Sequence, residues 1–189
     1  AGKRHMVSML PWGSGRSTAA FLASMHLLTR RMGGVLYVTP TAKVAELITR
    51  QAADFLLASG WAGALTLVCL TEGRADGERY RRLRWDDAQG MLVEWSDPTL
   101  IPNLVVVHPE TLSEFLLQGH PDYREFLADV ELVILDGADA FYGTVGTHVS
   151  LILRRLRLVL ERLGADYRTF TTVAPCANAL PHVTRLWGF

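Results

Sequence analysis

Short apolar runs alternate along the chain with longer stretches in which apolar residues recur every three or four positions. The short runs are typical of buried strands, and they occur at 6–10, 35–39, 64–70, 104–107, 132–135 and 170–173. The recurring pattern predicts helices at 17–31, 42–58 and 151–163. Because strands that are apolar throughout alternate with helices, we expect an α/β fold whose mostly parallel sheet is covered by helices on both faces.

The length of 189 residues fits one domain, so we expect 1–189 to fold as a single unit. One stretch, 72–102, interrupts the alternation, because it is rich in arginine and then mixed in character. It predicts an insertion at the surface with a hairpin near Gln89-Gly90. In a parallel sheet, ligands bind beyond the carboxyl ends of the strands, so we expect function in the loops that follow the apolar runs.

A glycine-rich loop joins the first predicted strand to the first predicted helix and contains Gly13, Ser14, Gly15, Arg16, Ser17 and Thr18. Backbone N–H groups in such a loop, and at the start of the helix it opens, bind phosphate. The loop departs from the usual pattern GxxxxGK[ST], because Leu10 stands at the first glycine and Arg16 at the lysine. We predict a nucleotide phosphate site at 13–18; the alternative is a glycine-rich helix start without a ligand.

The apolar run 132–135 ends in an acid, Asp136, which Gly137 follows. A carboxylate at the end of a buried strand is where nucleotide triphosphatases hold magnesium. Asp136 is therefore a candidate nucleotide and Mg²⁺ ligand, together with the hydroxyl of Ser17. The alternative is that Asp136 only caps the following turn. On the first interpretation, the glycine-rich loop and Asp136 lie side by side at the carboxyl ends of the strands.

The 19 basic and 19 acidic residues cancel, which excludes nucleic-acid binding by bulk charge alone but leaves room for a local basic groove. Cys69 and Cys176 lie far apart and no Cys/His ligand spacing occurs, so we predict neither a zinc site nor a disulfide framework. No apolar stretch reaches the roughly 20 residues that span a bilayer, and the amino end lacks a signal-peptide pattern. We therefore expect a cytoplasmic protein without a membrane partner.

Motif-like segments follow one another at 11–17, 38–43, 107–112, 136–139 and 173–178. In this order they resemble motifs I, Ia, Ib, II and III of superfamily 2 DEAD/DEAH-box helicases. The stretch 142–149, running into 154–157, is closest to the bacterial and fungal branch of mitomycin-repair-type DNA helicases with a C-terminal DUF1998-type domain.

The resemblance implies a RecA-like P-loop NTPase fold and the first lobe of a helicase motor, with ATP and Mg²⁺ as cofactors. Such a lobe works with a second RecA-like lobe in the same or another chain. The resemblance further implies that the motif Ia and Ib loops bind DNA or RNA through Thr41, Lys43, His108 and Thr111. For Thr41 and Thr111 the alternative is that they cap the helices that follow them.

Several positions depart from the motifs that the chain resembles. Arg16 replaces the motif I lysine, Gly137 the motif II glutamate and Asp139 the motif II histidine, while Val173 and Pro175 replace the hydroxyl residues of motif III. Glycine can neither orient nor deprotonate the attacking water. This implies a degenerate motor lobe that scaffolds nucleic-acid or protein binding with little or no ATP hydrolysis. Two alternatives stay open: a functional ATP-dependent DNA helicase lobe with an atypical phosphate loop, and a protein-interaction module without nucleotide binding.

Overall fold

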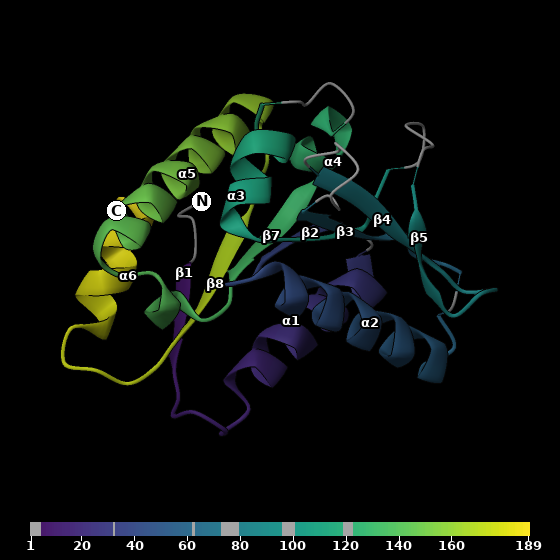
Figure 1. Ribbon diagram of the computed structural model, residues 1–189, viewed down its shortest axis with the longest axis horizontal. Helices are drawn as coiled ribbons and strands as arrows, with labels where there is room; N and C mark the ends of the chain where they lie inside the picture. Colours follow the sequence, from purple (N-terminus) through teal and green to yellow (C-terminus); the bar gives the residue numbers. More distant parts are fainter. Residues whose placement is uncertain (1–4, 32, 62, 73–79, 96–100, 119–122) are drawn as a thin grey trace.

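The computed structural model describes residues 5–31, 33–61, 63–72, 80–95, 101–118 and 123–189. Within these residues the strands form one eight-stranded sheet in the order β1-β8-β7-β2-β6-β3-β4-β5 (Figure 1). The strands are β1 (His5–Met9), β2 (Gly34–Val38), β3 (Leu67–Glu72), β4 (Tyr80–Asp86), β5 (Met91–Glu94), β6 (Leu104–Val107), β7 (Val130–Leu135) and β8 (Arg168–Val173). Neighbouring strands from β1 to β3 in this order run parallel, whereas β4 pairs antiparallel with both β3 and β5. The predicted mostly parallel sheet is confirmed.

Helices cover both faces of this sheet, as the sequence predicted (Figure 1). They are α1 (Arg16–Arg31), α2 (Ala42–Ala58), α3 (Pro109–Thr111), α4 (Arg124–Ala128), α5 (Gly143–Leu163) and α6 (Ala179–Trp187), with a π-helical turn at Leu112–Leu116 and a 3-10 turn at Ala138–Ala140. The helices α1 and α2 lie on one face, and α3 to α6 lie on the other. None of the described helices is long and apolar enough to cross a membrane.

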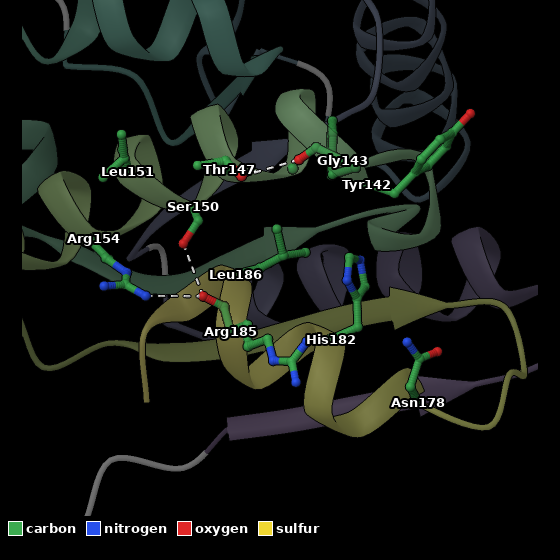
Figure 2. A pocket seen from close by; sticks show the side chains of 12 residues that line it. Tyr142, Gly143, Thr147, Ser150, Leu151, Arg154, Asn178, His182, Arg185 and Leu186 are labelled. Atoms are coloured by element: carbon green, nitrogen blue, oxygen red, sulfur yellow. Dashed lines mark hydrogen bonds between the residues drawn. The ribbon is translucent and has the colours of Figure 1, made fainter.

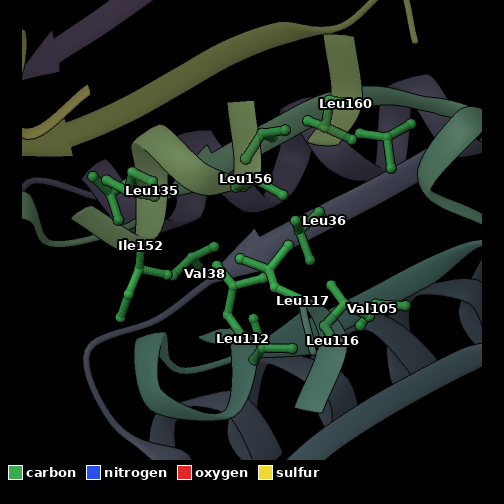
Figure 3. Close-up of a cluster of buried hydrophobic side chains, with 14 of the residues drawn as sticks. Leu36, Val38, Val105, Leu112, Leu116, Leu117, Leu135, Ile152, Leu156 and Leu160 are labelled. Atoms are coloured by element: carbon green, nitrogen blue, oxygen red, sulfur yellow. The ribbon is translucent and has the colours of Figure 1, made fainter. Parts of the chain in front are cut away.

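Alternate side chains of the central strands enter two cores, one on each face of the sheet. In β2, Val35 and Tyr37 pack with α1 and α2, whereas Leu36 and Val38 pack with α5 and the turn at Leu112–Leu116 (Figure 3). Because both faces of β2 are buried, polar and apolar residues do not alternate along it. This continuous apolar run is the pattern from which the strand was predicted. The two cores hold the strand ends, and therefore the loops after them, in fixed positions.

The hairpin predicted near Gln89-Gly90 is confirmed. The strands β4 and β5 pair antiparallel, and Gly90 at their turn has a φ of +63°. Both strands extend the main sheet beyond β3, so this segment continues the fold at one edge. The parts of 72–102 at 73–79 and 96–100 lie outside the described residues, and the insertion itself stays a prediction.

The helix predicted at 151–163 begins earlier, at Gly143. Glycine is a poor helix former, so its presence at 143 and 146 hid the first two turns. Gly146 serves close packing, because a Cβ at this position would stand 2.6 Å from the carbonyl oxygen of Phe141. The early start brings the branch-specific stretch 142–149 to the edge of the sheet where the motif loops lie. The helix α6 was not predicted.

Candidate nucleotide site and nucleic-acid interface

The loop between β1 and α1 is open to solvent. Gly13 and Gly15 have φ values of +78° and +87°, which L side chains rarely adopt. A Cβ built on Gly13 would meet no atom within 4 Å. Ser14 closes the turn, since its backbone N–H and its hydroxyl donate to the carbonyl oxygen of Pro11 at 3.3 and 2.6 Å. The loop therefore leaves its backbone accessible to a phosphate at the positive end of α1.

Asp136 follows β7 and is only 4% exposed, and three hydroxyls converge on its carboxylate. Ser17 and Thr172 donate to Oδ1 at 3.1 and 2.5 Å, and Tyr37 donates to Oδ2 at 3.1 Å. The bond from Ser17 joins the start of α1 to Asp136, so the predicted juxtaposition of the loop and the carboxylate is confirmed. The 3-10 turn after Asp136 begins at Gly137 without a side-chain cap. The alternative in which Asp136 only caps that turn is therefore wrong.

Tyr37 and Thr172 are residues of this site that the sequence did not indicate. They come from β2 and β8, the two strands that flank β7 in the sheet. Burial, and after it the negative charge of Asp136, raises the pKa of Tyr37 far above its usual value, so the phenol stays protonated and donates. For Tyr37 the signal available was a hydroxyl inside an otherwise apolar strand, because such a group needs a buried acceptor. Thr172 gave no such signal, because β8 contains two further threonines.

Arg16 forms a two-bonded ion pair with Asp139. Nη1 and Nη2 of Arg16 donate to Oδ1 and Oδ2 of Asp139 at 2.8 and 3.3 Å, and the arginine side chain is only 6% exposed. The backbone N–H of Ala174 donates to the same carboxylate at 2.9 Å. The ring of Trp12 covers the guanidinium at 3.9 Å. Arg16 and Asp139, which stand where the resemblance implies a lysine and a histidine, thus contact each other.

Gly137 occupies a backbone conformation suited to glycine. Its φ and ψ are 72° and 46°, in the left-handed region, and a Cβ there would stand 3.1 Å from Cγ of Pro40. Its N–H donates to the hydroxyl of Thr172 at 2.8 Å. A side chain at this position would strain the turn that links β7 to α5.

A groove of about 410 Å³ lies between the loops after β2 and β6 and the start of α5. Thr41, Lys43 and His108 line it, and His148 of α5 joins them. The two loops meet because β2 and β6 are adjacent in the sheet. The sequence favoured a packing role for His148 at the start of a helix, whereas its side chain is exposed and lines this groove.

The two threonines of these loops differ in role. Thr41 caps α2, since its hydroxyl accepts the N–H of Val44 at 3.3 Å. Thr111 is completely buried, and its hydroxyl lies 2.6 Å from Nε2 of His108. A buried hydroxyl offers no atom to a nucleic acid, so the predicted contact by Thr111 is wrong. Thr111 directly precedes the π-helical turn, but its side chain makes no capping bond there; its hydroxyl contacts the ring of His108 instead.

Together these features define a class of protein. A parallel sheet whose first strand leads through a glycine-rich loop into a helix, with a carboxylate beside that loop, is the RecA-like lobe of a P-loop NTPase fold. The sequence model of the DEAD/DEAH box helicases matches residues 1–176, and the chain belongs to this family. The resemblance seen in the motifs is confirmed.

Two curated relatives illustrate this membership. The chain is 29% identical over 87 residues to the ATP-dependent helicase hrq1 of Schizosaccharomyces pombe, covering 46% of this chain and 8% of that protein. It is 28% identical over 166 residues to the ATP-dependent helicase Lhr-Core of Methanothermobacter thermautotrophicus, covering 82% and 18%. The chain thus spans less than a fifth of the length of either relative.

Solved structures agree on the fold. The DUF1998 helicase MrfA bound to DNA and AMPPNP aligns with a TM-score of 0.77 at 18% identity, over 98% of this chain and 24% of that one. The DEAD-box helicase Mss116 bound to ssRNA and UDP-BeF aligns with a TM-score of 0.65 at 16% identity, over 98% and 35%.

Proposed function

We propose that the chain is a degenerate motor lobe of its family, which binds nucleic acid and hydrolyses ATP slowly or not at all. The observation that carries this proposal is the geometry at Gly137, directly after Asp136. The motif it resembles has a glutamate there, which positions the attacking water. Here no carboxylate stands at that position, and the left-handed backbone beside Pro40 favours glycine. The lobe therefore lacks the group that would orient or deprotonate water.

ATP would bind to the loop at 13–18, with Ser17 and Asp136 as the Mg²⁺ ligands. The accessible backbone at Gly13 and the oxygen donors of Ser17 and Asp136, 3.1 Å apart, support this, because Mg²⁺ prefers oxygen ligands. When bound, Mg²⁺ would neutralise phosphate charge. The residues fit nucleotide binding better than they fit hydrolysis.

The ion pair between Arg16 and Asp139 is a reason to expect that nucleotide binds only weakly. A phosphate that recruits Arg16 has to compete with a carboxylate already held at 2.8 and 3.3 Å. Two-bonded pairs of this kind are among the stronger charge-assisted contacts in proteins. Arginine is also bulkier than lysine and does not substitute freely at a site built for an ammonium.

Nucleic acid, DNA or RNA, would lie in the 410 Å³ groove, with Lys43 as its cation and Thr41 and His108 beside it. Contacts to the phosphate backbone position a strand without reading its sequence. Because the net charge is zero and the groove is lined by one lysine and one acid, Glu110, we expect weak binding that falls steeply with salt. A second RecA-like lobe, in the same or another chain, would complete the channel.

Two measurements test this function. Titration of a fluorescent ATP analogue with Mg²⁺ measures nucleotide binding, and phosphate release with and without single-stranded DNA measures turnover. We expect binding without turnover above that of the Asp136→Ala variant. Robust turnover that Asp136→Ala abolishes would establish the functional ATP-dependent lobe instead. A chain that binds neither nucleotide nor oligonucleotide would establish the protein-interaction module.

A further inference from the structure

A second groove, of about 600 Å³, separates α5 from α6 (Figure 2). Arg154 lines it from α5, and His182 and Arg185 line it from α6. None of the described residues that line this groove is acidic, although the net charge of the whole chain is zero. The groove between α5 and α6 therefore concentrates positive charge at one place on the surface.

Both arginine side chains are exposed, and that of Arg154 is anchored. Nη2 of Arg154 donates to the carbonyl oxygen of Arg185 at 3.4 Å, and the hydroxyl of Ser150 donates to the same oxygen at 2.9 Å (Figure 2). Neither arginine has a carboxylate partner among the described residues. A guanidinium has five N–H donors, so Arg154 keeps most of its donors for a ligand. Two exposed cations without a counter-charge, one of them held in place, suit an anionic ligand.

The groove between α5 and α6 continues the groove beside Lys43 around the first turns of α5. Phe141 borders both cavities, while His148 lines the first and Thr147 lines the second. Tyr142 directly precedes α5 and is 76% exposed, so its ring is available for a base to stack on. The branch-specific stretch 142–149, which the nucleotide site does not use, thus lies between two surfaces suited to a strand.

We propose that the groove between α5 and α6 binds phosphates of the same single strand that lies beside Lys43, with Arg154 and Arg185 as its cations. This rests on the proposed function, because it extends that strand past Tyr142. An acidic protein segment is the other class of ligand that two arginines attract. Continuity with the groove beside Lys43, and the exposed aromatic ring between the two, favour nucleic acid.

Oligonucleotides of increasing length test the proposal. Fluorescence anisotropy with oligo(dT) at several salt concentrations compares the wild-type chain with R154Q/R185Q, with Lys43→Ala and with the control R124Q/R162Q. The control removes two exposed arginines of α4 and of the last turn of α5. Glutamine keeps part of the stem and a donor, and melting temperatures verify that every variant is folded.

We expect R154Q/R185Q to bind the shortest oligonucleotides like the wild-type chain and longer ones more weakly. Each phosphate contact to a single strand contributes about 0.7 to the slope of log affinity against log salt, so the slope with long oligonucleotides decreases by about 1.4. The control leaves affinity and slope unchanged at every length.

Three results overturn the inference. If Lys43→Ala weakens binding but R154Q/R185Q behaves like the control, the groove between α5 and α6 binds no strand and the proposed function stands. If no oligonucleotide binds, or Lys43→Ala has no effect, the nucleic-acid part of the proposed function fails as well. If R154Q/R185Q loses affinity for polyglutamate and keeps it for oligonucleotides, this groove accepts an acidic protein segment.

Discussion

Replacing Asp139 by asparagine removes a charge and keeps the shape of the side chain. Arg16, 6% exposed, loses its partner at 2.8 and 3.3 Å, while the amide oxygen of asparagine still accepts the N–H of Ala174. Breaking one half of a buried ion pair costs roughly 3–5 kcal/mol. The Asp139 side chain is 18% exposed and the ring of Trp12 still covers the guanidinium, so we expect the lower end, about 3 kcal/mol.

The same variant is expected to change nucleotide affinity in the opposite direction. For a chain of this length 1 kcal/mol corresponds to roughly 2–4 °C, so the Tm of D139N falls by about 6–12 °C. The freed guanidinium of Arg16 then becomes available to phosphate. Affinity for ATP therefore rises while stability falls, which a merely structural role of Asp139 would not produce.

Thermal unfolding of R16M, D139N and R16M/D139N completes a double-mutant cycle, and we expect a coupling energy of about 1–3 kcal/mol. The control is Glu161→Gln, which removes the more exposed ion pair with Arg157 at 3.9 Å and is expected to cost less than about 0.5 kcal/mol. If D139N has the same Tm as the wild-type chain, the ion pair does not stabilise the loop and this reasoning is wrong.

Three further predictions concern single positions. Gly137→Ala lowers the free energy of unfolding by about 1–2 kcal/mol because of its left-handed backbone; Gly137→Glu restores no ATP turnover, and measured turnover in that variant would contradict the backbone argument. Thr41→Ala loses the cap of α2 and about 1 kcal/mol by thermal melting, with oligonucleotide affinity unchanged; the reverse pattern would establish a direct contact. Burial raises the pKa of Cys69 to about 12, so at neutral pH we expect a maleimide to label only the exposed Cys176. Detection of two labels on the native protein by mass spectrometry would refute this.

The parallel sheet, and the proximity of the glycine-rich loop to Asp136, were predictable because each depends on a local sequence pattern and one rule of topology. Strands buried on both faces can carry little but apolar residues, so β2, β6 and β7 appear directly in the sequence. Parallel strands end at a common edge, which placed the glycine-rich loop near Asp136 without knowledge of the strand order.

The contacts that complete the site were not predictable from local patterns. Arg16 and Asp139 lie 123 positions apart and were interpreted as two separate losses, although each satisfies the charge of the other. Thr111 has the sequence position of a loop residue, yet it ends α3 with its side chain fully buried. The glycines at the start of α5 oppose a helix locally, although Gly146 is required there by the close approach of the Phe141 carbonyl oxygen.

The turn at Gly137 also limits how this lobe can evolve. A glutamate introduced there meets a left-handed backbone and the ring of Pro40, so the reverse substitution is penalised by the fold before it could restore any chemistry. Reshaping the turn first would disturb the N–H bond from Gly137 to Thr172, whose hydroxyl donates to Asp136. If the proposed function holds, a mutation that introduces glutamate at this position is penalised by the fold itself. Selection could then act on the binding surfaces of the lobe more readily than on its hydrolytic chemistry.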